Sequence, residues 1–292
     1  MHTSLTINNF TFKWGARTYI MGILNVTPDS FSGDGLVRDE VVVETAIDQA
    51  RGFVEAGADI LDVGGESTRP GAETVSGAEE LERVIPVVRR LAEEFDTLIS
   101  IDTYKAQVAE AALGAGADMV NDVWGLRADP NLAEVVARHG VPVILMHNRS
   151  TPKNAEVREQ LGGRYVGVEY NDLLPDIRHE LMESVELARQ ARIPDEHIIL
   201  DPGIGFGKTV EQNLELLDRL GEVRDLGYPI LLGPSRKSFI GYTLDLPMDE
   251  RQEGTAATIS VGIVRGADIV RVHNVQMMAR VVRMTDAVVR RG

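Results

Sequence analysis

Three acidic or amide side chains, Asp102, Asn121 and Asp201, each stand at the end of a short apolar run of the chain. Carboxylates and amides that converge on one pocket suit a flat heterocycle rich in N–H donors, because a carboxylate accepts two hydrogen bonds in a plane. Taken singly, Asp102 could instead cap a helix, and the other two could tie down loops. Burying an unpaired polar group costs about 1–3 kcal/mol. Because the other apolar runs also end in hydrogen-bonding residues, a shared polar site is the better interpretation.

Basic residues stand at the same ends of the apolar runs. The chain has 292 residues and a formal net charge of -15, from 45 acidic and 30 basic side chains. Only five of the basic residues are lysine, yet three of these follow apolar runs directly, together with three arginines: Lys105, Lys208, Lys237, Arg69, Arg236 and Arg271. Bases beside glycine loops and helix N-termini are typical of anion sites, and phosphate is the usual occupant. The alternative is a solvated rim with incidental bases.

Composition excludes several kinds of protein. The chain has no cysteine, which rules out a disulfide framework and a thiol nucleophile and makes the cytoplasm the default location. Its pI near 4.9 argues against nucleic-acid binding. No apolar run approaches the ~20 residues that cross a bilayer, and the N-terminus does not resemble a secretory signal. The six histidines are scattered, and His147 is expected to be a packed residue rather than a ligand. A magnesium ion held by one amide or carboxylate and by substrate phosphates stays open.

The apolar runs have the length of strands, and amphipathic segments separate them. In residues 39–56, for example, Val42, Ala46, Ala50 and Phe53 would share one helical face. The tripeptide Gly-Ala-Asp recurs at 57–59, 116–118 and 266–268, with glycine in the helix C-cap role. Continuous apolar strands flanked by helices indicate a parallel sheet. The expected strands are residues 19–26, 59–65, 98–104, 119–124, 142–148, 198–203, 229–235 and 269–274.

Eight strand–helix units between residues 19 and 274 predict a (β/α)8 TIM barrel, an α/β fold. The alternative, a doubly wound open sheet, would require a G-x-G-x-x-G turn after the first strand, where the chain reads Asn25-Val26-Thr27-Pro28. Residues 5–14 alternate around Asn8-Asn9 and predict a hairpin. No linker composition occurs, so we expect one domain over residues 1–292, with residues 1–18 capping the bottom of the barrel. A barrel carries its chemistry at the carboxyl ends of its strands, where all the polar residues above would meet.

Motifs at the ends of the expected strands mark the chain as similar to a known family. They are MGILNVTPDSFS at 21–32, DVGGESTRPG at 62–71, SIDTYK at 100–105, NDV at 121–123, DPGIGFGK at 201–208, and GPSRKSFIG at 233–241 with VRVHN at 270–274. In this order they resemble the dihydropteroate synthases, folate-pathway enzymes that are the targets of sulfonamides. The resemblance extends from residue 19 to residue 273.

The resemblance implies a transferase that condenses 6-hydroxymethyl-7,8-dihydropterin diphosphate with 4-aminobenzoate, releasing pyrophosphate and 7,8-dihydropteroate. Carried over by motif, the pterin would contact Asp102, Asn121, Asp201 and Lys237, with Met146, Phe206 and Arg271 lining its pocket and Gly233 and Ser235 nearby. The diphosphate would contact Asn25, Thr68, Arg69, Arg271 and His273, and Asn25 would also bind Mg2+. The aminobenzoate site would include Phe31, Pro70 and Ser238. Family members are usually homodimers, for which the last helices offer Val261, Ile263, Val264, Met277, Met278 and Val281, although core packing explains these residues equally well.

Departure of pyrophosphate from an electron-rich dihydropterin makes a dissociative step plausible, and water must be kept from the resulting cation. The segments 27–36 and 66–75 are long and contain glycine, as expected of lids. The family usually reads Ser-Asp-Gly-Gly where this chain has Ser32-Gly33-Asp34-Gly35. We expect Asp34 still to fold over the reacting centre as a catalytic residue, because the flanking glycines permit rearrangement.

Two other functions stay open at this point. A methyltetrahydrofolate:corrinoid methyltransferase would share the acid and amide cradle but would not need the SRKS, STRPG and VRVH contacts to an anion. A barrel that binds a pterin without catalysis would tolerate loss of the lid motifs, which this chain keeps.

Overall fold

The computed structural model describes residues 3–26, 39–67, 74–158 and 160–290. Within them, a parallel sheet of eight strands runs in the order β10-β7-β6-β5-β4-β3-β12-β11. A parallel bridge between Leu200 and Ile230 joins the two ends of this order, so the sheet closes. The predicted barrel is therefore confirmed. Its strands are β3 (Tyr19–Asn25), β4 (Ile60–Gly64), β5 (Leu98–Asp102), β6 (Met119–Asp122), β7 (Val143–Met146), β10 (Ile198–Asp201), β11 (Leu231–Leu232) and β12 (Ile269–Val272).

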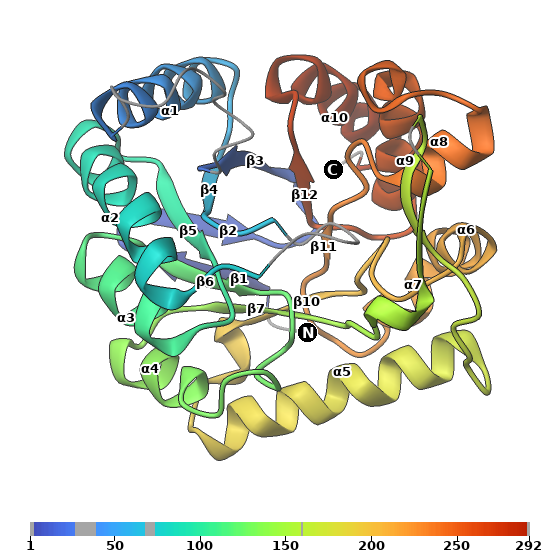
Figure 1. Ribbon diagram of the computed structural model, residues 1–292, viewed down its shortest axis with the longest axis horizontal. Coiled ribbons are helices and arrows are strands. Elements are labelled where there is room, and N and C mark those ends of the chain that lie inside the picture. The colour runs from blue at the N-terminus through green and yellow to red at the C-terminus, as the bar shows by residue number, and fades with distance from the viewer. Residues whose placement is uncertain (1–2, 27–38, 68–73, 159, 291–292) are drawn as a thin grey trace.

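Helices surround the strands, as Figure 1 shows. The helix α2, for example, buries an apolar stripe toward the sheet, in which Val84, Val87, Val88 and Leu91 are fully buried. Not one of the described helices is long and apolar enough to cross a membrane. The helices are α1 (Asp39–Glu55), α2 (Gly77–Glu94), α3 (Ala106–Gly114), α4 (Leu132–His139), α5 (Leu173–Gln190), α6 (Val210–Asp218), α7 (Leu220–Arg224), α8 (Ser238–Leu244), α9 (Gln252–Val264) and α10 (Val275–Val289), with short 3-10 turns η2 (Pro152–Asn154), η3 (Asp195–His197) and η4 (Met248–Glu250).

The repeated Gly-Ala-Asp tripeptide ends a helix and links the following strand to its neighbour by a hydrogen bond. Its glycines have φ of +95° at position 57, +115° at 116 and +104° at 266, the left-handed conformation expected after a helix. The aspartates then accept hydrogen bonds from backbone N–H groups of the neighbouring strand: Asp59 from Ile20 at 2.9 Å, Asp118 from Ile99 at 2.8 Å and Asp268 from Ile230 at 3.1 Å. The aspartate of each repeat therefore connects two adjacent strands through a side-chain-to-backbone hydrogen bond.

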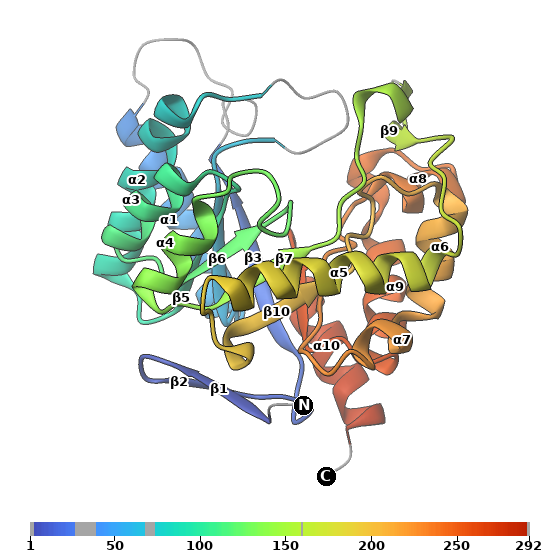
Figure 2. The ribbon, with the colours of Figure 1, turned by 90° about the horizontal axis from the view of Figure 1, so that it is seen from below.

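The N-terminal hairpin lies across one end of the barrel (Figure 2). Strands β1 (Ser4–Ile7) and β2 (Phe10–Lys13) pair antiparallel around Asn8, which has φ of +51°. Leu5, Ile7 and Phe12 are buried in one cluster with the residues that begin the barrel strands, such as Ile60. The hairpin thus packs on the end opposite to the carboxyl ends of the strands.

A second hairpin, β8 (Ala155–Arg158) with β9 (Gly162–Tyr165), follows β7, and the sequence did not predict it. Most of its side chains are partly or fully exposed, so it lacks the apolar alternation that signals a strand. Polar contacts hold it instead. Arg251 donates to the carbonyl of Leu161 at 2.9 Å, and Tyr242 donates to that of Gly162 at 3.1 Å.

Candidate active site

Strand register brings the predicted polar residues to one rim of the barrel. Asp102 at the end of β5 is the register partner of Asn121 on β6, and Asp201 at the end of β10 is the partner of Met146 on β7. Asn121, Met146 and Asp201 are buried, with at most 6% of their surface exposed. Because β5, β6, β7 and β10 are neighbours in the sheet, these side chains lie along the same rim.

Arg271 of β12 reaches across the barrel to two carboxylates. Its Nε lies 2.5 Å from Oδ2 of Asp62, and its Nη2 lies 2.5 Å from Oδ2 of Asp102. Asn121 donates to the same oxygen of Asp62 at 3.1 Å. Burial lowers the pKa of Arg271, but the two carboxylates outweigh this effect and raise it above its usual value. The guanidinium is therefore a permanent cation at the centre of the rim.

Asp62 is the residue that the sequence did not single out. It is fully buried on β4, and its second oxygen, Oδ1, has no hydrogen-bond partner among the described residues. An acid in the middle of the apolar run 59–65 was the available signal, because such a side chain needs a partner inside the barrel. The structure supplies Arg271 and Asn121 as those partners, so Asp62 orients two predicted site residues at once.

Asp102 has a strongly shifted pKa. Burial raises it to about 7, with the nearby carboxylates of Asp62 and Glu80 adding to the shift and Arg271 opposing it. The side chain of Asp102 therefore gains or loses its charge near neutral pH. Ionised, it can only accept hydrogen bonds; protonated, it also donates one.

Lys237 and Phe206 lie beside Asp201. Burial raises the pKa of Asp201, while Lys237 and the backbone N–H of Gly203, which donates to Oδ1 at 2.7 Å, counteract it. The Nζ of Lys237 donates to the carbonyl of Ile204 and lies 4.4 Å from the centre of the Phe206 ring. Burial lowers the pKa of Lys237 to about 8, so it is largely charged at neutral pH.

Further around the rim, Ser235 holds His273. Its Oγ lies 3.0 Å from Nδ1 of His273 and accepts the backbone N–H of the same residue at 3.2 Å. Gly233 adjoins Arg271, since a Cβ at 233 would lie 3.8 Å from the Cβ of Arg271. Ser238 is the first residue of α8, and Asn25 is the half-buried last residue of β3. Asp34, Phe31, Thr68, Arg69 and Pro70 lie outside the described residues.

Two of the three lysines predicted for the anion site are elsewhere. The Nζ of Lys105 lies 2.5 Å from each of the carboxylates of Glu66 and Glu80, so its charge is already paired with acids of the chain. Lys208 is only 2% exposed and contacts backbone carbonyls and His147. The prediction was wrong for both, because position after a strand does not fix the direction of a long side chain. Lys237 remains at the rim.

His147, predicted to be packed, is 1% exposed and fills the space between Lys208 and Glu180. No group of three or more acidic, histidine or cysteine side chains that could hold a metal occurs among the described residues. A cation at the rim would need oxygen ligands from a substrate or from water.

The sequence model of the family described as "Pterin binding enzyme" matches residues 21–273. The chain belongs to this family. It is 50% identical over 288 residues to the dihydropteroate synthase of Clostridium beijerinckii, covering 98% of this chain and 100% of that one.

Solved structures agree with this assignment. A Clostridium difficile dihydropteroate synthase crystallised with pteroic acid is 50% identical, with a TM-score of 0.87 over 96% of this chain and 100% of the other. A Xanthomonas albilineans dihydropteroate synthase with 4-aminobenzoic acid is 38% identical, with a TM-score of 0.87 over 99% and 98% of the two chains.

Proposed function

We propose that this chain is a transferase that condenses 6-hydroxymethyl-7,8-dihydropterin diphosphate with 4-aminobenzoate to form 7,8-dihydropteroate and pyrophosphate. The observation that carries the proposal is the meeting of Asp102, Asn121, Asp201 and Lys237 at the carboxyl end of the barrel, with Arg271 between them. Dihydropteroate synthases of about 50% identity over nearly the whole chain support the same reaction.

The pterin would lie among the acids and the amide. Asp102 and Asp201 would accept hydrogen bonds from its amino and amide edges, and Asn121 can both donate and accept. Met146 and the Phe206 ring would line the pocket, with Gly233 and Ser235 at its margin. Arg271 now contacts Asp102 at 2.5 Å, so it would have to leave that carboxylate for the pterin to use both oxygens. The guanidinium could then cover a pterin face and meet the diphosphate.

The diphosphate would contact Arg271 and His273, joined by Thr68 and Arg69. Asn25 offers a single amide oxygen at the end of β3, which fits Mg2+ because this ion keeps several waters and binds substrate phosphates through few protein ligands. When bound there, Mg2+ would neutralise negative charge on the leaving pyrophosphate. Arg271 and His273 would orient the leaving group and stabilise the same charge.

The second substrate would enter beside α8. Ser238, Phe31 and Pro70 would hold 4-aminobenzoate so that its amine faces the exocyclic carbon of the pterin. A positive charge that develops at this carbon is delocalised into the dihydropterin ring, so water must be excluded until the amine attacks. We expect Asp34 to help close the site at this stage.

We also propose that the chain is a cytoplasmic homodimer that associates through α9 and α10. These helices contact each other through Ser260 and Thr285, whose hydroxyl oxygens are 3.1 Å apart. Their apolar exposed residues include Val261 (41%), Val264 (57%) and Met284 (66%). Ile263 and Met278, expected in the same surface, instead lie in the core at 3% and 1% exposure, while Met277 and Val281 are half-buried.

A charge in this surface tests the dimer. Val264→Glu should convert a dimer to a monomer in analytical ultracentrifugation, because an unpaired carboxylate would be buried at the interface. Val157→Glu serves as the matched control, because it puts the same charge on an exposed valine of β8, outside α9 and α10. A wild-type chain that sediments as a monomer at all concentrations would refute the proposal.

The reaction itself is tested by pyrophosphate release. With the dihydropterin diphosphate, sustained release that depends on 4-aminobenzoate is expected. A methyltransferase or a pterin-binding barrel without catalysis would show no such dependence, so its absence would eliminate the proposed reaction.

A further inference from the structure

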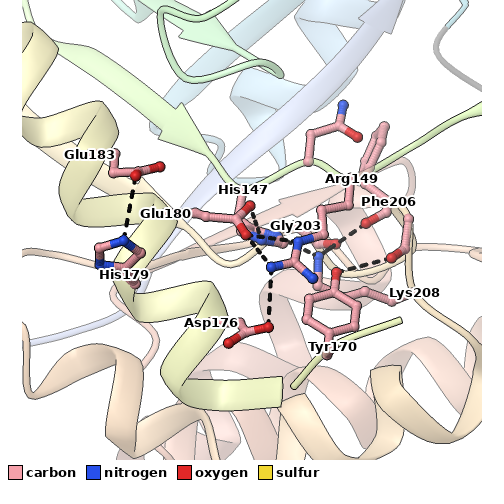
Figure 3. Close-up of polar contacts among 12 residues, drawn as sticks. His147, Arg149, Tyr170, Asp176, His179, Glu180, Glu183, Gly203, Phe206 and Lys208 are labelled. Carbon is pink, nitrogen blue, oxygen red and sulfur yellow. Dashed lines mark hydrogen bonds and ion pairs between the residues drawn. The ribbon is translucent and has the colours of Figure 1, made fainter. Parts of the chain in front are cut away.

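Lys208 is a buried cation that the proposed reaction does not use. Lys208 belongs to the segment that joins β10 to α6, directly after the loop 202–207. Its side chain packs under this loop, and the residue is 2% exposed. Its Nζ is 2.9 Å from the carbonyl oxygen of Gly203, 3.0 Å from that of Phe206 and 2.9 Å from Nδ1 of His147. Figure 3 shows these groups converging on the amine. Three acceptors match the three N–H groups of an ammonium.

The neighbouring histidine supports this protonation state. Nε2 of His147 lies 3.1 Å from Oε2 of Glu180, and it has no hydrogen-bond partner among the described residues. Burial raises the pKa of Glu180, but His147 and Arg149 outweigh this and lower it to about 2. Since this carboxylate is ionised, the imidazole must carry its proton on Nε2 and accept at Nδ1.

His147 itself stays neutral, because burial first and the Lys208 cation second lower its pKa to about 3. Burial also lowers the pKa of Lys208 well below its ordinary value, and the Asp201 carboxylate opposes this shift. A neutral amine, however, would turn its lone pair toward one of three acceptors at 2.9–3.0 Å. The contacts therefore assign the proton to Lys208, whose charge the carboxylates of Asp201 and Glu180 favour.

The loop that Lys208 holds is packed tightly against His147 and Arg149, which follow β7. Gly203 and Gly207 have φ of +71° and +59°, and a Cβ would lie 1.8 Å from the carbonyl oxygen of His147 at the first and 2.3 Å from the carbonyl carbon of Arg149 at the second. Tyr170 adds an uncharged anchor, since its hydroxyl donates to the carbonyl of Gly207 at 3.0 Å. The loop has little freedom to adjust when one anchor is lost.

The same loop shapes the pterin side of the site. The N–H of Gly203 donates to Asp201, and the carbonyl of Ile204 accepts from Lys237, whose Nζ lies over the Phe206 ring. Lys208 is thus connected to Asp201 both through the backbone of the loop and through its charge, which lowers the pKa of that carboxyl.

Other charges act on the same groups. Asp201 also faces the cations Lys237 and Arg271, which lower its pKa. The charged neighbours of the Lys208–His147 pair are Asp201, Lys237, Glu180, Arg149 and Arg127. Removing the Lys208 charge would leave Asp201 with two cations instead of three, so its carboxylate would protonate at a higher pH.

We propose that Lys208 is a positioning residue of the pterin site, whose ammonium fixes the carbonyls of Gly203 and Phe206 and keeps Asp201 ionised to accept hydrogen bonds from the pterin. The inference rests on the proposed function, because it assumes that a pterin occupies the rim beside Asp201. Lys208 does not touch the substrate and acts through Asp201 and Phe206.

The test is the pH dependence of pteroate binding, measured by titration calorimetry without turnover. The affinity for pteroate is expected to fall at acidic pH as Asp201 becomes protonated, and we call this fall the acidic limb. In Lys208→Met the limb should move to higher pH by roughly one unit, so that the affinity at pH values below the limb is about tenfold lower than in the wild type. Tyr170→Phe is the matched control, because it removes an uncharged anchor of the same loop and should leave the limb in place. Asp201→Asn should abolish the part of the limb that belongs to Asp201 and so assign it.

Lys208→Gln keeps N–H donors without the charge, so it replaces the methionine variant if that chain does not fold, and it should show the same shift. An equal loss of affinity at every pH, or no shift in either variant, would overturn the inference. A wild-type chain that binds no pteroate would instead refute the proposed function. Pteroate binding by the wild type with unshifted variants would refute only the role of Lys208.

Discussion

Arg271 and Lys208 are both cations at the carboxyl end of the barrel, but their partners differ in kind. Arg271 is 21% exposed at its side chain and joins two carboxylates, Asp62 and Asp102, from different strands. Lys208 is buried, and its direct partners are two carbonyls and a neutral histidine. Ion pairs near solvent can be exchanged for a substrate, whereas a buried cation whose three donors are satisfied is costly to move. The comparison separates two proposed roles: Arg271 would bind the ligand, whereas Lys208 would hold the loop that shapes the site.

Replacing Arg271 should have the largest effect on turnover. Arg271→Lys keeps the charge but loses the planar fork that reaches Asp62 and Asp102 together. We expect kcat/KM for the dihydropterin diphosphate to fall roughly 100-fold, because the same group would stabilise the leaving diphosphate. Steady-state kinetics with both substrates measures this effect. Kinetics close to wild type would mean that Arg271 is a structural ion-pair partner, and the contrast with Lys208 would disappear.

Asp62 should have an intermediate effect. The carboxylate of Asp62 pairs with Arg271 and accepts a hydrogen bond from Asn121, and Asp62→Asn removes its charge. We expect a roughly tenfold loss in kcat/KM, equivalent to about 1.4 kcal/mol. The charge of Asp62 also raises the pKa of Asp102. Without it, Asp102 stays ionised to lower pH, so the part of the acidic limb that belongs to Asp102 should move down.

The shift to lower pH expected for Asp62→Asn is opposite to the shift to higher pH expected for Lys208→Met. The two variants together therefore test whether the two charges act as proposed. Asp102→Asn in the same series identifies the limb of Asp102. If the Asp62 and Lys208 variants moved the pH dependence in the same direction, the removal of an anion and the removal of a cation would not have opposite effects on the acids of the rim, and the comparison would be wrong.

Lys105 should have the smallest effect on turnover. It follows the end of β5 in the sequence, but its partners are Glu66, Glu80 and the carbonyl of Val75. Lys105→Met should leave kcat/KM essentially unchanged while lowering the free energy of unfolding by roughly 1–3 kcal/mol, because the buried Glu80 loses its partner. Thermal melting and kinetics on the same preparation separate the two effects. A large rise in KM for the diphosphate without loss of stability would restore Lys105 to the anion site.

Much of the barrel could be predicted from the sequence, because its strands are continuous apolar runs and each ends in a polar residue. Register then brought Asp102 beside Asn121, as expected for parallel neighbours. The β8–β9 hairpin was missed because polar contacts such as that of Arg251 hold it rather than an apolar face.

The direction of side chains was the other limit. Lys105 and Lys208 both follow strands, yet one folds back onto Glu80 and the other enters the protein behind Asp201. Nothing in the spacing distinguishes these outcomes, because a lysine stem reaches several ångströms either way. Asp62 was hidden for a related reason, since an acid inside an apolar run is explained only by a partner from a distant strand.

The central claim is that the acids and the amide of the rim form a cradle for a pterin. Calorimetric titration of 6-hydroxymethyl-7,8-dihydropterin diphosphate with Mg2+, in the absence of 4-aminobenzoate, tests it most directly. We predict one site per chain in the wild type and loss of at least tenfold in affinity for Asp201→Asn, equivalent to about 1.4 kcal/mol. Equal affinity in the two proteins, or no binding by the wild type, would contradict the claim.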